Sequence, residues 1–100
     1  MIRRLEDKKM KTVEVKFEGT VDLFVATVQM RKLRFDDGVA TIELPGGQEY
    51  PLQWFARGTP QTKYTIKITK PTEAKFVHSA TLDDHMKDAG VFWFTLSEGD

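Results

Sequence analysis

Residues able to do chemistry are few in this chain of 100 residues. There is no cysteine, which excludes a disulfide, a thiolate zinc site and a cysteine nucleophile. The richest group of oxygen and nitrogen ligands is Asp83, His85 and Asp88, which could approach a divalent cation. Their spacing fits neither a calcium loop, with its alternating ligands and distal glutamate, nor the paired histidines of helical zinc motifs. We therefore expect a solvated loop with no metal, and no cofactor elsewhere.

Motifs of catalysis are equally scarce. A nucleophile elbow, a glycine-rich phosphate loop and the HExxH motif are absent from the sequence. Ser79 and Ser97 have no base near them in the sequence, and a pairing of Glu43 with Glu49 is not visible in one sequence. His78 shares the phase of the apolar residues around it, so we expect it to pack against a strand face with its imidazole hydrogen-bonded. The sequence predicts that the chain is not an enzyme.

The eleven aromatic residues are more informative. Phe24, Phe55 and Trp93 lie out of phase with the apolar residues of their strands, so their rings point outward if each strand has one buried face. Exposed aromatic surface usually marks a partner or ligand site, and Trp and Arg are favoured interface anchors. We predict a binding site of Phe24, Phe55, Arg57 and Trp93; alternatively, these strands are covered on both faces or bent at a barrel corner. Seven further aromatics are expected in the core: Phe17, Tyr50, Trp54, Tyr64, Phe76, Phe92 and Phe94.

Apolar and polar residues alternate with period two from Thr12 onward, which predicts half-buried β-strands. The phase changes twice between residues 21 and 35, which predicts bulges or bends near Ala26 and Arg31-Lys32. Asp36-Asp37-Gly38 is a strong hairpin signal, and Pro51 favours an edge strand or a bend. Further alternating or apolar runs cover residues 40–44, 50–56, 64–68, 76–82 and 91–96.

About seven short strands without a credible helix predict one antiparallel, immunoglobulin-like β-sandwich, or alternatively a small β-barrel. We place this single domain at residues 12–98. Residues 1–11 form a basic, flexible leader in this interpretation. They hold five Lys and Arg against two Asp and Glu, or +3, which leaves −3 for the rest of a chain with zero net charge.

Residues 60–68, Pro-Gln-Thr-Lys-Tyr-Thr-Ile-Lys-Ile, resemble a late strand of fibronectin type III and other immunoglobulin-like modules. These modules commonly read proline, glycine, threonine, any residue and tyrosine, followed by alternating apolar residues. The resemblance implies a sandwich and a tyrosine corner, in which the Tyr64 hydroxyl bonds back to the upstream backbone. It carries the architecture rather than membership of a particular family.

Recognition of another protein, or self-association, is the function that these features favour. A carbohydrate-binding module is the second hypothesis, with Tyr50, Trp54 and Trp93 as a platform and Gln53 and Arg57 as hydrogen-bonding groups. A single-stranded nucleic-acid-binding barrel is the third, using the basic residues Arg31, Lys32 and Arg34, although zero net charge argues against it. The sequence shows no apolar run of membrane-spanning length and no signal peptide. Its cysteine-free composition is compatible with the cytoplasm or with an exported domain.

Overall fold

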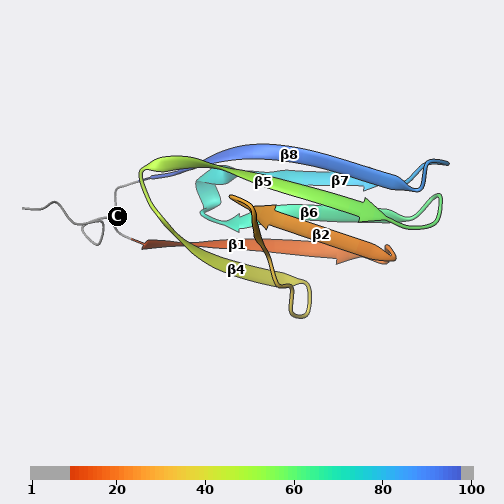
Figure 1. Cartoon of the computed structure of the whole chain (residues 1–100), viewed down its shortest axis with the longest axis horizontal. Coiled ribbons are helices and arrows are strands. Elements are labelled where there is room, and N and C mark those ends of the chain that lie inside the picture. Colours follow the sequence, from red (N-terminus) through yellow and green to blue (C-terminus); the bar gives the residue numbers. More distant parts are fainter. Residues whose placement is uncertain (1–9, 98–100) are drawn as a thin grey trace, which may run out of the picture.

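The computed structural model describes residues 10–97, which form two four-stranded antiparallel sheets packed as two layers (Figure 1). In sheet A the strand order is β4-β1-β6-β7, and in sheet B it is β3-β2-β5-β8. Neither sheet closes into a barrel, so the two-layer sandwich is confirmed and the barrel alternative is wrong. The strands are β1 (Met10–Gly19), β2 (Leu23–Val28), β3 (Arg31–Lys32), β4 (Val39–Pro45), β5 (Gln48–Arg57), β6 (Lys63–Lys70), β7 (Val77–Thr81) and β8 (Lys87–Leu96).

The hydrophobic core lies between the inner faces of the two sheets. Alternate residues of each strand point inward, as the period-two pattern predicts. In β5 the inward residues are Tyr50, Leu52, Trp54 and Ala56, and each is at most 6% exposed. The largest fully buried side chains come from both sheets and from Leu82, which directly follows β7: Tyr50, Tyr64, Leu44, Leu52, Ile66, Leu82 and Leu96.

The outer face of sheet A is polar apart from four residues at strand ends, which are Met10, Val39, Pro45 and Val77. Its side chains pair across neighbouring strands, as in the hydrogen bond of 2.7 Å from Thr12 to Glu43 and the one of 2.8 Å between Thr65 and Ser79. Such cross-strand pairs stabilise a solvated face of a sheet. The polar residues of this face are Thr12, Glu14, Lys16, Glu18, Thr41, Glu43, Lys63, Thr65, Lys67, Thr69, Ser79 and Thr81.

Strand β2 corrects two expectations. It pairs with β5 without a register shift from Leu23 to Val28, so the bulge predicted near Ala26 is wrong. The second phase change comes from a two-residue turn at Gln29 and Met30, which lies between β2 and β3. The phase of the apolar residues misled the prediction because β2 carries apolar residues on both faces.

The turn at Asp36-Asp37-Gly38 is confirmed, because Asp37 and Gly38 both have positive φ and Asp36 bridges to Val39. The hairpin expected around it does not extend further. Residues 33–35 form no strand, and β4 pairs instead with β1 from Val39 to Pro45. The local sequence therefore predicts the turn correctly, whereas the pairing of β4 with β1 depends on residues far away in the chain.

Pro51 lies in a central strand, not in an edge strand. β5 pairs with β8 along its whole length and with β2 from Arg57 to Leu52. The carbonyl of Pro51 accepts a hydrogen bond of 3.3 Å from the Gln29 amide, so the Pro51 nitrogen also points toward β2. Because β2 ends at Val28, opposite Leu52, the missing N–H of Pro51 costs no ladder hydrogen bond.

The predicted boundary of the domain shifts slightly. Strand β1 begins at Met10, so the last two residues of the predicted leader belong to the sheet, while residues 1–9 and 98–100 lie outside the described residues. The one helical element of the described part is the 3₁₀ turn η2 (Thr72–Ala74). Among residues 10–97, no helix has the length and apolar character needed to cross a membrane.

Candidate binding face

The outer face of sheet B is largely apolar, in contrast to that of sheet A. Trp93 is 57% exposed, Val91 52% and Leu23 40%. Phe55, Val25 and Pro51 on the same face are half-buried. Monomeric proteins rarely expose contiguous apolar surface of this kind without a use for it. We define the binding face by its apolar residues, which are Leu23, Val25, Pro51, Phe55, Ala89, Val91 and Trp93.

The strand register brings these residues into adjacent rows across three strands. Val25 of β2 lies opposite Phe55 of β5, which in turn lies opposite Ala89 of β8. The next rows place Gln53 opposite Val91, and Pro51 opposite Trp93. Cross-strand neighbours of this kind have Cβ atoms about 4.5–5.5 Å apart, so the apolar surface is continuous.

A shallow hollow of about 240 Å³ lies in the middle of the binding face. Its lining residues are Val25, Thr27, Gln53, Trp54 and Phe55. It combines apolar walls with the amide of Gln53 and the hydroxyl of Thr27. Such a surface can receive an apolar side chain and a few hydrogen bonds.

The ends of the binding face carry opposite charges. Arg57 and Lys87 are opposite each other at one end, next to Leu23. Glu49 and Thr95 are opposite each other at the other end. The apolar centre therefore has a polar rim, which is the general arrangement of protein interfaces.

The structure brings together three of the four residues predicted as a binding site. Trp93, Phe55 and Arg57 share the outer face of sheet B, with Trp93 and Arg57 exposed. Phe24 points the other way. Its ring stacks on Phe17 with centroids 4.0 Å apart.

The outward orientation predicted for Phe24 is therefore wrong. The ring packs between the sheets because Ala56, opposite it in β5, leaves room for it. The prediction overlooked Leu23, Val25 and Val91. Apolar residues in both phases of β2 and β8 were the signal in the sequence that could have revealed them.

A polar network joins the two sheets beside the open side of β7 and β8. The Trp54 Nε1–H donates to the Tyr64 hydroxyl at 2.9 Å, and that hydroxyl donates to Asp88 Oδ2 at 2.5 Å. His78 Nε2 lies 3.3 Å from the same carboxylate oxygen. The prediction of a packed, hydrogen-bonded His78 is confirmed, and its ring centroid lies 5.0 Å from that of Trp54.

The hydrogen bond back to the upstream backbone is made by Tyr50, not by Tyr64. The tyrosine corner implied for Tyr64 is wrong, because its hydroxyl bonds across the core to Asp88. Tyr50 instead donates back to the upstream carbonyl of Pro45 at 2.6 Å. Burial raises the pKa of both tyrosines, and for Tyr64 the hydrogen bond to Asp88 raises it further.

Gly90 makes room for the buried indole of this network. It lies opposite Trp54 in the register of β5 and β8. A Cβ added to Gly90 would overlap the six-membered ring of Trp54. A glycine here thus permits the close approach of a ring to the backbone.

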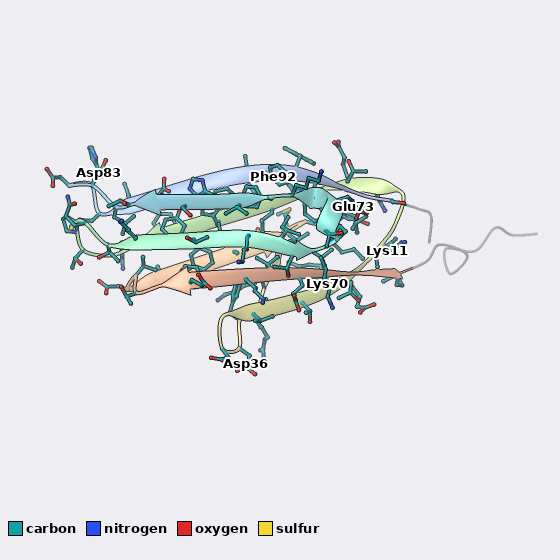
Figure 2. All side chains as sticks on the ribbon, turned by 180° about the vertical axis from the view of Figure 1, so that it is seen from behind. Lys11, Asp36, Lys70, Glu73, Asp83 and Phe92 are labelled. Atoms are coloured by element: carbon teal, nitrogen blue, oxygen red, sulfur yellow. The ribbon has the colours of Figure 1, made fainter. Side chains whose placement is uncertain are left out.

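Asp83, His85 and Asp88, the weak candidate for a metal-binding loop, do not come together. Asp83 accepts hydrogen bonds from the backbone N–H and from Nδ1 of His85, and the backbone bond holds the pKa of this carboxyl below its ordinary value. Asp88 belongs instead to the network around Tyr64. Figure 2 shows Asp83 at one end of the sandwich, far from Lys11 at the other. Among the described residues, no group of three His, Cys, Asp or Glu side chains has the geometry to hold a metal ion.

The residues predicted for a carbohydrate platform and for a nucleic-acid-binding barrel do not form those sites. Tyr50 and Trp54 are buried in the core, so the three-ring sugar platform is wrong, and only Trp93, Gln53 and Arg57 remain on the surface. Arg31, Lys32 and Arg34 are exposed at and beyond the short edge strand β3. They do not line a barrel groove, because the sheets do not close.

Comparisons of the chain with models of known protein families, with curated proteins and with solved structures found no match.

Proposed function

We propose that the chain is a non-catalytic interaction module that docks another protein on the binding face of sheet B. The observation that carries this proposal is the asymmetry between the two outer faces. The face of sheet A is polar between its strand ends, with Thr, Lys and Glu side chains, and its exposed apolar residues Met10 and Val77 lie apart at those ends. The face of sheet B instead presents Trp93, Val91, Leu23 and Phe55 on adjacent strands. A sheet that met only water on its outer side would alternate apolar and polar residues.

The energetics favour a partner that is itself a folded surface. Burying a Val, Leu or Phe side chain contributes about 1.5–3 kcal/mol. The face offers several such residues on rigid strands, so little conformational entropy is lost on binding. Trp93 at the edge and Arg57 at the end are the residue types that most often dominate interface energies.

The charges of the rim describe the expected partner. Its surface has an apolar centre, acidic groups that meet Arg57 and Lys87, and a basic group that meets Glu49. Complementary rim charges of this kind mainly set orientation and association rate. We therefore expect the association rate to fall with rising salt concentration, while the apolar contacts persist.

The test uses matched lysine substitutions on the two faces. Proteins retained by the immobilised chain from an extract of its source organism are identified, purified and titrated against each variant. Leu23→Lys and Trp93→Lys weaken binding at least about ten-fold, which corresponds to about 1.4 kcal/mol. Thr41→Lys and Thr81→Lys, on the outer face of sheet A, leave the affinity within about two-fold.

Two outcomes contradict the proposal. In one, Leu23→Lys and Trp93→Lys bind the purified partner as well as the unmodified chain does. In the other, no purified protein binds, and a polysaccharide array shows sugar binding that depends on Trp93. That second result favours the carbohydrate hypothesis, which now rests on Trp93, Gln53 and Arg57 alone.

A further inference from the structure

Strand β8 forms the free edge of sheet B. It pairs with β5 over ten residues, from Lys87 to Leu96. Within residues 10–97, no strand pairs with its other side. A long edge strand exposes a row of backbone donors and acceptors that another strand can use.

The hydrogen-bond directions identify which backbone groups of β8 face this free side. In β5, the carbonyls of Pro51 and Arg57 accept from residues next to β2, so the odd residues of β5 point toward β2 and the even ones toward β8. The carbonyl of Leu96 accepts from Gly47 at 2.7 Å, so the even residues of β8 point toward β5. The residues whose backbone groups point away from β5 are consequently Ala89, Val91, Trp93 and Thr95.

The composition of this edge sets it apart from the other three. β8 has neither a charged residue nor a proline from Ala89 to Leu96. The edge strand β3 has two residues, both of them basic, while β4 contains Glu43 and ends at Pro45. β7 has five residues. Charges, prolines and short length are the usual protections of edge strands, and β8 has none of them along this run.

Open space borders the second half of this edge. A pocket of about 320 Å³ is lined by residues 92–95 and Ser97 on one side, and by Glu73 and Ala74 of η2 on the other. Figure 2 shows Phe92 of β8 and Glu73 of η2 on the same side of the sandwich, where they line this pocket. Consecutive residues of β8 line the pocket, so the strand is approachable from its edge.

We propose that β8 pairs in antiparallel orientation with β8 of a second copy, so that the two B sheets form one continuous eight-stranded sheet. In a twofold antiparallel pair of identical strands, only the residue on the axis lies opposite its own copy, and a charged residue there would be destabilising. The run from Ala89 to Leu96 carries no charge, so no like charges meet at an axis within it. The twofold symmetry of the pairing closes the assembly at a dimer.

The register follows from the direction of side chains and backbone. A twofold axis at Val91 places Val91 of the two copies opposite each other and directs their free N–H and C=O groups at one another. The same register places Trp93 opposite Ala89 of the second copy, a large side chain beside a small one. The two binding faces then lie side by side on one surface. The pairing itself uses backbone groups and therefore does not depend on the proposed partner.

The first experiment measures self-association by sedimentation equilibrium. The unmodified chain forms a dimer, and Val91→Pro raises its dissociation constant at least about ten-fold, because two symmetry-related N–H donors are lost. Val91→Thr retains the N–H and the strand propensity, and dimerises like the unmodified chain. Leu23→Lys, on the same face but far from β8, also leaves the dimer intact.

The second experiment locates the contact without relying on the proline variant. The chain has no cysteine, so a single introduced one reports on one position. Val91→Cys forms an intermolecular disulfide rapidly, because directly opposed strand residues lie within the Cα spacing of a disulfide. Thr27→Cys, next to the opposite edge of sheet B, does not. In hydrogen exchange, the amides of Val91 and Trp93 become protected as the concentration rises.

Several results overturn the inference. A chain that stays monomeric at every accessible concentration, with fast exchange at the Val91 amide, leaves no second copy on this edge. Dimers that Leu23→Lys abolishes and Val91→Pro does not are held by the binding face instead. That outcome contradicts the edge pairing and leaves the proposed binding face standing.

Discussion

Tyr64 shows how one side chain can link the two layers of the sandwich. Its hydroxyl accepts from Trp54 of sheet B and donates to Asp88 of the same sheet, while its own strand belongs to sheet A. A buried polar group is tolerated only when its hydrogen bonds are made. The network therefore fixes the lateral position of the two sheets as well as satisfying the indole.

We expect Tyr64→Phe to lower the free energy of unfolding at neutral pH by about 1–3 kcal/mol, because the Trp54 Nε1–H loses its partner inside the core. Urea unfolding monitored by circular dichroism measures this loss. Tyr50→Phe, which removes the hydrogen bond to the Pro45 carbonyl and leaves no buried donor without a partner, serves as the matched control and costs about 1 kcal/mol. Equal stability of Tyr64→Phe and the unmodified chain contradicts the role given to this hydroxyl.

The stability difference between the unmodified chain and Tyr64→Phe should decrease at high pH. Burial raises the pKa of Tyr64 above its ordinary value of 10.0, so the folded state binds this proton more tightly than the unfolded state. The stability that the neutral hydroxyl contributes is complete below pH 10.0 and falls as the pH rises above that value. The stability difference between the unmodified chain and Tyr64→Phe should accordingly narrow in unfolding series above pH 10.0.

At the scale of elements, the turn between β2 and β3 is built from unusual residues. Gln29 and Met30 have φ values of 52° and 67°, which a type I′ turn requires at both central positions. Asn-Gly is the preferred pair there, whereas other L-residues pay for the left-handed conformation. The turn thus follows from the pairing of β2 with its neighbours rather than from its own sequence.

Replacing Gln29-Met30 by Asn-Gly should raise the free energy of unfolding by about 1 kcal/mol, because it relieves this backbone conformation. Thermal and urea unfolding provide the measurement. Met30→Ala removes the exposed side chain but keeps the positive φ, and should leave the stability within about 0.5 kcal/mol. A loss of stability in the Asn-Gly variant is incompatible with a type I′ turn at this position.

Most strands can be predicted from the sequence, but the buried face can be predicted for only some of them. β1, β5, β6 and β7 each have one mainly apolar phase, and the prediction of their inner faces is confirmed. β2 and β8 carry apolar residues in both phases, and for β2 the wrong phase was taken as the core. The same ambiguity affected the candidate site. The outward orientation predicted for Trp93 and Phe55 is found in the structure, whereas Phe24 of β2 points into the space between the sheets.

At the scale of the whole molecule, the chain passes repeatedly from one sheet to the other. Of the seven connections between consecutive strands, five pass from one sheet to the other, and only those from β2 to β3 and from β6 to β7 stay within a sheet. Neither sheet can detach without breaking the core that both share. This architecture predicts cooperative unfolding of the described domain.

A single-tryptophan variant tests this cooperativity. In Trp93→Phe, the remaining Trp54 reports on the space between the sheets, while far-ultraviolet circular dichroism reports on the strands. The two signals should give the same urea midpoint, as two-state unfolding requires. Separate midpoints point to a sheet that unfolds alone.

By itself, the sequence determined that this is an all-β chain without a long helix, where most of its strands run, and that its turns lie at Asp37-Gly38 and other polar breaks. Those features depend on local periodicity and on the φ values that each residue allows. Tertiary structure alone decided which face of β2 is buried, that Tyr64 bonds to Asp88, and that β8 is left as an edge. These outcomes depend on pairs of residues far apart in the chain, and a period-two pattern carries no information about which strand lies beside which.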